Sequence, residues 1–438
     1  MREFEQYIKA VEEQIRCKRA VPCIEEELKS HLEDQKEALI RDGMEEEKAC
    51  KEAVRQMGDP VEVGVMLDRI HRPKMEKSLL AIVIILSIVG ALLQFLARGP
   101  WKSYILFMGI GLIIMIGMYF IDYSILATHP FLFWFGIGAG GILFVLFSGR
   151  GMVNGSFGYQ TQQILLLFAP AYGGILYYFR GKKYKGIFLS LLFLLLPFSI
   201  VIYTVNLSGF FILFPVFLFM LGVSVWKGWF GVKKIFGMGI VCSPIVVGAL
   251  TAVFAYGSTI IKSYQKVRIE AFWNPEKYAK GAGYLTYHLR NMSSGLKWFG
   301  EGMGTNELVE LPSMHSDYIV FFLVYHFGMA AGILIVSFLL YLIGRMFKLS
   351  MRQKNRLGTL VGMGCTGVFF VETVSYILMN FGKLPAFRAY MPFLSSGRGQ
   401  VIHYLLIGVM LSVYGNTNVI TEKTMGFLHA TSSSHSGK

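Results

Sequence analysis

Residues 78–98 read SLLAIVIILSIVGALLQFLAR, a run in which the only charged residue is the last one, Arg98. A helix needs about 20 apolar residues to cross the hydrocarbon core of a bilayer. Similar runs follow, and the expected spans are 78–98, 102–121, 129–147, 160–179, 184–204, 207–225, 234–256, 316–344, 357–381 and 400–416. The sequence therefore predicts an all-α, polytopic membrane helix bundle of about ten transmembrane helices.

The composition of the whole chain agrees with lipid as its solvent. The 438 residues are 54% hydrophobic and only 16% charged, whereas ordinary soluble domains carry roughly 25% charged residues. The net charge of +14 is spread over short loops between apolar runs and is not gathered in one patch. We therefore expect contact with membrane lipids and no binding of nucleic acid. The acidic, amphipathic start of the chain predicts no cleaved signal peptide.

Residues 1–74 predict a small helical domain ahead of the membrane domain, which we place at 75–416. Apolar residues recur at helical spacing, beginning with Phe4, Ile8, Val11 and Ile15. Breaks at 21–22, 42–43 and 58–60 divide the segment into about three helices. With its ELKSHLED and MGDP stretches it resembles the permease prefix domain of several bacterial membrane proteins. No nucleophile with a base and no metal-ligand spacing is visible, so we expect a regulatory or docking role.

Basic residues concentrate in the loops on one side of the expected bundle. They are Arg180, Lys182, Lys183, Lys185, Lys227, Lys233, Lys234, Arg345, Lys348, Arg352, Lys354 and Arg356. Cytoplasmic loops carry an excess of Lys and Arg. This distribution predicts that both termini are cytoplasmic, with residues 417–438 forming a disordered cytoplasmic tail.

Residues 257–316 are expected to form one large extracellular loop between the seventh and eighth spans. Loops of this length are uncommon and usually functional. Most of the acidic residues beyond position 75 belong to this loop or its end, namely Glu270, Glu276, Glu301, Glu307, Glu310 and Asp317. Such a cluster beside a membrane helix predicts a reaction or binding site.

Asp317 stands where the loop ends and an apolar run begins, and two interpretations of it are open. A carboxylate at the membrane surface can act as general base for a hydroxyl on a lipid-linked substrate. Alternatively, Ser316 or Asp317 caps the eighth helix by accepting hydrogen bonds from its free N–H groups. From the residues alone, the cap is favoured.

Two further features have less specific interpretations. Residues 136–141 match GxGxxG but lie within an apolar span, so they indicate close helix packing and not a nucleotide site. Glu372 lies within the ninth span, where a carboxylate is expensive and often functional. It is either part of a proton or ion relay in a transporter or a neutral, hydrogen-bonded side chain.

Several motifs occur in a fixed order along the chain. They are GMVNGS (151–156), RIEAFWNPEKYAKGAGY (268–284), SSGLKWFGEGMG (293–304), LPSMHSDYI (311–319), HFGMAAG (326–332) and LMNFGKLPAFRAYMPFLSSG (378–397). In this order they resemble the motifs of the shape, elongation, division and sporulation (SEDS) family. The resemblance covers roughly residues 79–414. It implies the family architecture, with its largest outer loop between the seventh and eighth spans.

The resemblance also implies an activity. Members of the family are peptidoglycan glycosyltransferases of the bacterial cell membrane that polymerise lipid II in cell-wall synthesis for shape, division or sporulation. Their essential aspartate corresponds to Asp317, which becomes the expected catalytic base. Candidate substrate-binding residues are Arg268, His315, Ser316, Arg290, Lys297 and Ser395, with Arg388 and Arg398 as additional anion contacts. Expected partners are lipid II and a monofunctional, class B penicillin-binding transpeptidase. No cofactor is indicated beyond a divalent cation, Mg²⁺ or Mn²⁺, for which Asp317 is the candidate ligand.

Some polar residues of the family pattern are replaced in this chain. Ser313 and Asn206 stand where family members carry an acid. Tyr325 and His326 stand where family members carry a pair of glutamates. Two alternatives therefore remain open: a non-catalytic SEDS paralogue acting as a scaffold or sensor, and a flippase or transporter of the lipid precursor that uses Glu372.

Overall fold

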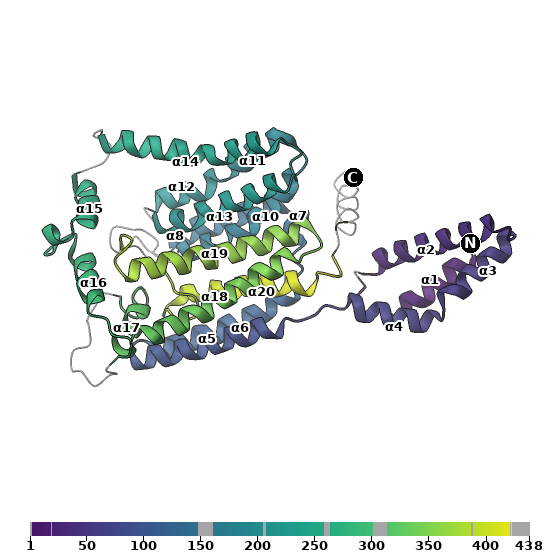
Figure 1. Ribbon diagram of the computed structural model, residues 1–438, viewed down its shortest axis with the longest axis horizontal. Helices are drawn as coiled ribbons and strands as arrows, with labels where there is room; N and C mark the ends of the chain where they lie inside the picture. Colours follow the sequence, from purple (N-terminus) through teal and green to yellow (C-terminus); the bar gives the residue numbers. More distant parts are fainter. Residues whose placement is uncertain are drawn as a thin grey trace.

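The regular structure of the chain is helical. The computed structural model describes residues 2–18, 20–147, 161–204, 207–257, 263–300, 313–386, 389–420 and 422, and every regular element in those ranges is a helix (Figure 1). The all-α class is confirmed.

The segment before the membrane region forms four helices, not the expected three. They are α1 (Arg2–Gln14), α2 (Val21–Arg41), α3 (Glu46–Met57) and α4 (Pro60–His71). The expected count is wrong because the break at 58–60 starts a helix of its own. Asp59 caps that helix by accepting from Val61 N at 2.8 Å, and Pro60 occupies its first position. Buried apolar side chains, including Val11 and Leu32, form the core of this unit.

The chain is a multi-pass membrane protein. Eight of the described helices are long and apolar enough to span a bilayer. They are α5 (Lys77–Leu96), α6 (Trp101–Phe120), α8 (Pro130–Phe147), α11 (Lys183–Phe193) continued by α12 (Leu195–Tyr203), α13 (Leu207–Trp226), α14 (Lys234–Gly257), α18 (Met329–Met351) and α19 (Arg356–Asn380). The remaining two expected spans contain shorter, largely buried helices, α10 (Phe168–Phe179) with α9 (Thr161–Leu165) before it, and α20 (Val401–Gly415). A short α7 (Ile125–Thr128) precedes α8.

Helix α19 lies at the centre of the bundle and α14 at its edge. In the apolar stretch of α19 that is long enough to span a bilayer, 78% of the residues are buried, against 11% in the corresponding stretch of α14. Figure 1 shows α14 along the upper edge of the bundle, where it packs on α11 and α13. Polar residues on α19 are consequently shielded from lipid and can support a site.

The expected eighth span, 316–344, is wrong at its start because Gly328 interrupts the helix. Gly328 has φ 90°, and it separates α17 (Ile319–Phe327) from α18. The neighbouring loop approaches closely here: Met329 N donates to Lys297 O at 3.0 Å, and a Cβ on Gly328 would lie 2.5 Å from Trp298 O. Only glycine combines this φ with this contact. Asp317 is therefore separated from the spanning helix by α17.

We expect Gly328→Ala to destabilise the protein by about 3 kcal/mol, from left-handed backbone strain and from overpacking against the loop. Thermal unfolding in detergent measures the effect. Gly344→Ala is the matched control, because it lies on α18 with nothing within 4 Å of its Cβ position. Equal melting temperatures for the two variants would contradict this account of the break.

The remaining short helices lie at one end of the bundle, which we call the Asp317 end. Figure 1 shows α15 (Ser263–Trp273), α16 (Tyr284–Ser294) and α17 there, while α1–α4 project beyond the opposite end. Single 3₁₀ turns, η1 (Glu276–Tyr278) and η2 (Arg398–Gln400), complete the described elements. The segments 258–262 and 301–312 of the expected loop and residues 423–438 of the expected tail lie outside the described residues.

The linker between α4 and α5 is bonded to the ends of two membrane helices. Lys74 N donates to Gly415 O of α20 at 3.3 Å. Arg345 of α18 forms a salt bridge with Glu76 and donates to Ser78 Oγ at 2.9 Å. Burial acts to raise the pKa of Glu76, but hydrogen bonds from Ser78 and Arg345 outweigh it and hold the pKa below its ordinary value. The carboxylate therefore stays ionised in this joint.

Candidate functional site

Asp317 is buried at the end of a tight turn, with its backbone fixed on both sides. Only 8% of the residue is exposed. Its N–H donates to Ser313 O at 2.8 Å, and its carbonyl accepts from Asn380 Nδ2 at 2.9 Å. The backbone from which the carboxylate projects is thus fixed by these two bonds.

Three consecutive carbonyls, those of residues 315–317, are held by donors from three separate parts of the chain. We call these donors the clamp: Gln94 of α5, Tyr376 and Asn380 of α19, and Ser395 and Ser396 of the 389–397 loop. The His315 carbonyl accepts from Gln94 Nε2 at 2.9 Å and from Ser396 N at 3.0 Å. The Ser316 carbonyl accepts from Tyr376 Oη at 2.9 Å and from Ser395 Oγ at 2.5 Å. Such a set of directional bonds fixes one geometry for the segment.

The first turn of α17 is bonded to α19. Ile319 N donates to Tyr376 Oη at 3.1 Å, and Phe321 N donates to Asn380 Oδ1 at 3.0 Å. The residue before the helix is Tyr318, which makes no side-chain capping bond. The expectation that Ser316 or Asp317 is the N-cap is therefore wrong, because α19 supplies the acceptors that a cap would provide.

Backbone strain concentrates around this site. The described non-glycine residues with positive φ are Arg98, Lys183, Ser313 and Phe393. Ser313 starts the turn that carries Asp317, and Phe393 lies in the loop of the clamp, where its carbonyl accepts from the Tyr104 hydroxyl. Arg98 precedes Gly99, whose Cβ position is 2.9 Å from His315 Nδ1. Strained residues of this kind persist where the surroundings over-determine them, and they cluster at functional sites.

Three of the predicted site residues lie together with Asp317. His315 and Ser316 give their carbonyls to the clamp, and Ser395 is one of its donors. The ring of His315 is half-buried against Gly99, and this burial lowers the pKa of the imidazole. His315 and Ser316 hold the segment through their carbonyls and Ser395 through its hydroxyl, whereas the carboxylate of Asp317 is the acidic group of the segment.

One of the predicted cations is bound to main-chain carbonyls, whereas the other described ones are exposed. Arg290 binds main-chain carbonyls, with Nε donating to Gly382 O at 3.0 Å and Nη2 to Phe272 O at 3.1 Å, so it connects α16 to the end of α19. Arg268 on α15, Lys297 and Arg398 on η2 are exposed. Arg388 lies outside the described residues, as do residues 148–160 with the GMVNGS motif. The exposed cations are the ones accessible to a charged ligand.

Glu372 has a partner that the sequence did not reveal. Its Oε2 lies 2.8 Å from Nε2 of His403 on α20, and both side chains are fully buried. His403 is the only histidine of the tenth expected span. An isolated histidine in an apolar run indicates a buried polar partner, and this was the sequence signal for the pair.

The other missed residues share a similar signal. Gln94, Tyr376 and Asn380 are polar groups near the Asp317 end of long apolar helices. A buried side chain of this type needs a hydrogen-bond partner. Their partners lie up to 300 positions away in the sequence, so composition alone did not connect them.

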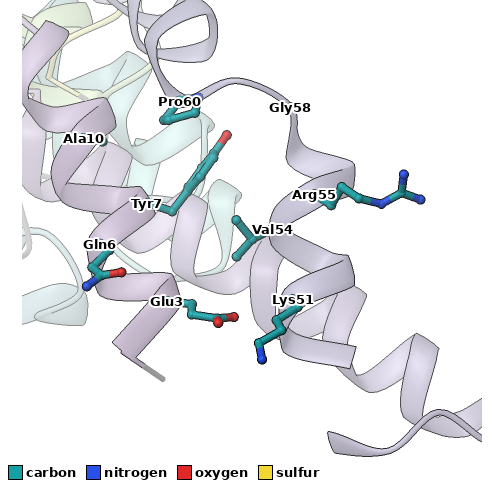
Figure 2. Close-up of a pocket in the computed structure, with 9 residues that line it drawn as sticks. All are labelled: Glu3, Gln6, Tyr7, Ala10, Lys51, Val54, Arg55, Gly58 and Pro60. Carbon is teal, nitrogen blue, oxygen red and sulfur yellow. The ribbon is translucent and has the colours of Figure 1, made fainter. Parts of the chain in front are cut away.

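Neither a metal cluster nor the hollow of the N-terminal helices provides a competing site. Within the described ranges, no three His, Cys, Asp or Glu side chains converge on one point. Figure 2 shows a hollow of about 570 Å³ bounded by α1, α3 and the start of α4. Lys51 and Arg55, which line it, are paired with Glu47 and Glu52 at 3.2 and 2.7 Å.

The fold and the site together define a multi-pass helical membrane protein with one buried aspartate fixed at one end of the bundle. A model of the cell cycle protein family, which comprises FtsW, RodA and SpoVE, matches residues 162–418. Because this match covers more than half of the chain, the protein belongs to that family, the SEDS family.

Relatives and solved structures agree with this assignment. The chain is 27% identical over 188 residues to a probable peptidoglycan glycosyltransferase FtsW of Trichlorobacter lovleyi, covering 42% of this chain and 47% of the relative. It is 27% identical over 217 residues to the corresponding protein of Lactococcus lactis, covering 48% and 50%. The chain thus spans about half the length of the curated relatives it matches.

Two solved structures share the fold. A chain of a peptidoglycan synthase complex, solved in a study of how polymerization and crosslinking are coordinated, superposes with a TM-score of 0.59 at 17% identity, over 78% of this chain and 97% of that one. RodA of Thermus thermophilus gives a TM-score of 0.50 at 14% identity, over 78% and 96%. At these identities the likeness shows the fold.

Proposed function

We propose that this protein is a peptidoglycan glycosyltransferase that polymerises lipid II. One observation carries the proposal: Asp317 is held by main-chain bonds at the bundle end and is the acid that corresponds to the family aspartate. The names of the FtsW relatives support it.

In the proposed reaction, a sugar hydroxyl of one substrate attacks the anomeric carbon of another, with inversion, and the pyrophosphate leaves. A neutral hydroxyl is a weak nucleophile, so a base must accept its proton, and we assign this role to Asp317. Arg268 and Lys297, exposed at the same end, would offset the charge of the leaving pyrophosphate. If Mg²⁺ or Mn²⁺ takes part, Asp317 would supply one ligand and the substrate phosphates and water the others.

The assay is direct. Purified full-length protein incubated with lipid II should give polymer on a gel. Absence of polymer, even with its transpeptidase present, would contradict the proposal.

The partner we propose is a class B penicillin-binding transpeptidase, and copurification from mild detergent tests it. The similar chain from a peptidoglycan synthase complex supports this choice of partner.

We further propose that the Asp317 end faces outward and both termini lie in the cytoplasm. The basis is the charge of the opposite end, where Arg180, Lys183 and Arg345 lie near helix ends.

A cysteine at Ser294, exposed on α16, should react with an impermeant maleimide on intact cells. A cysteine at Lys183, exposed at the start of α11, should react only after the membrane is permeabilised. Both are placed in a background without the native cysteines, since Cys242 is exposed. The reverse labelling pattern would overturn this orientation.

Two other functions have specific support. The replacement of family acids by Ser313, Tyr325 and His326 favours a non-catalytic scaffold or sensor. The buried Glu372–His403 pair favours a flippase or transporter. In the transporter case, Glu372→Gln should abolish transport while Asp317→Asn spares it.

A further inference from the structure

The buried Glu372–His403 pair joins α19, which supplies two of the clamp donors, to α20, which follows the loop that supplies two more. Glu372 lies on α19, and His403 lies in the first turn of α20, with a separation of 2.8 Å between Oε2 and Nε2. Both side chains are fully buried. A buried pair of this kind sets relative helix geometry more sharply than apolar packing, because its hydrogen bond has a direction.

On α19, the pair lies directly in line with two clamp residues. Glu372, Tyr376 and Asn380 are spaced four residues apart, so they share one face of the helix. One helical turn, about 6 Å, separates Glu372 from Tyr376. Tyr376 and Asn380 make four of the hydrogen bonds that hold the Asp317 segment and the start of α17.

On the other side, His403 contacts the loop that supplies the clamp donors Ser395 and Ser396. The His403 ring lies 6.3 Å from the ring of Phe393 and 5.5 Å from that of Phe369. Phe393 has φ 65° and lies two residues before Ser395. A bulky residue in this conformation must be held by its surroundings. His403 is one of the side chains that hold it.

We propose that Glu372 and His403 are positioning residues for Asp317. This inference rests on the proposed glycosyltransferase function. The pair fixes the place of α20 and its preceding loop relative to α19, so that the clamp donors of α19 and those of the loop meet at residues 315–317. Misplacement of a catalytic group by about 1 Å can cost about 100-fold in rate, which is why such a tie beneath the site matters.

The test compares full-length variants in lipid II polymerisation. Glu372→Met/His403→Leu removes both polar groups together, so neither is left buried and unpaired. We expect kcat to fall about tenfold or more while KM for lipid II stays unchanged. Glu372→Gln, which still accepts a hydrogen bond from His403, should retain kcat near wild type. Should the double variant fail to fold, His403→Phe keeps the ring contacts with Phe369 and Phe393 but loses the hydrogen bond, and it should show the same fall in kcat.

A matched control and a second readout separate positioning from general stability. Ser412→Ala removes a buried bond between the same helix α20 and Ile121 O, at the far end from the site, and should leave kcat unchanged. Hydrogen exchange at the amides of Ile319 and Phe321, which bond to Tyr376 and Asn380, should accelerate in the double variant or in His403→Phe, but not in Ser412→Ala.

The outcomes distinguish this inference from the proposed function. If wild type polymerises lipid II and the pair variants do so at the same kcat with unchanged exchange, the positioning role is overturned and the glycosyltransferase stands. A loss in Glu372→Gln as large as that in the double variant would also overturn it, because the charge and not the hydrogen bond would then matter. If wild type gives no polymer, the glycosyltransferase fails, and exchange at Ile319 and Phe321 alone decides the role of the pair.

Discussion

Asp317→Asn is expected to lower lipid II polymerisation by roughly two orders of magnitude, the usual scale for loss of a general base. The melting temperature should not change, because the two side chains are nearly equal in size and the bonds with Ser313 and Asn380 are made by the backbone of residue 317, which the substitution keeps. Gel analysis of the polymer and thermal unfolding in detergent measure the two quantities.

The control for this variant is Asp122→Asn. Asp122 is 9% exposed, close to the 8% of Asp317, and lies at the opposite end of the bundle, where its Oδ1 accepts from Ser124 N at 2.8 Å. An asparagine oxygen can accept the same bond, so activity should be retained. An active Asp317→Asn enzyme would end the assignment of Asp317 as the base.

The second large effect is expected for Asn380→Ala. This variant removes the bonds to Asp317 O at 2.9 Å and from Phe321 N at 3.0 Å, leaving both main-chain groups buried without these partners. We expect stability to fall by about 1–3 kcal/mol and kcat to fall by about 10- to 100-fold as Asp317 loses its position. Denaturation in detergent and kinetics with lipid II measure the two losses.

Asn355→Ala is the matched control, at the other end of the same helix. Asn355 is also buried, and it binds the Tyr123 hydroxyl at 2.7 Å and Gly358 N at 2.6 Å. Its removal should cost comparable stability without a specific loss of kcat. Equal loss of kcat in the two variants would show that Asn380 acts only through stability.

The helical class and the position of the catalytic candidate were predictable because their signals are local in the sequence. Runs such as 78–98 reveal spans through composition alone. Asp317 was found through motifs in a fixed order. The break at Gly328 was missed, because its cause is a φ of 90° and contact with the loop at Trp298. An apolar run that continues through a glycine gives no sign of such contact.

The clamp and the Glu372–His403 pair were not predictable for a different reason. Gln94 and His315 are 221 positions apart, and Glu372 and His403 are 31 apart on different helices. Which side chains meet depends on how each helix is rotated about its axis in the bundle. Hydropathy does not define that rotation for α19, which is apolar on nearly all sides and mostly buried.

The joint at Glu76 and Lys74 connects the linker to two helices of the bundle. The linker is attached to Arg345 near the end of α18 and to Gly415 at the end of α20. At 1.5 Å per residue, these helices extend about 34 and 22 Å toward the Asp317 end. Helix α18 begins there at the glycine contact with the loop, and α20 follows the loop of the clamp. The two helices that hold the linker after α1–α4 are therefore the same two that begin beside the loop contact and the clamp loop at the Asp317 end.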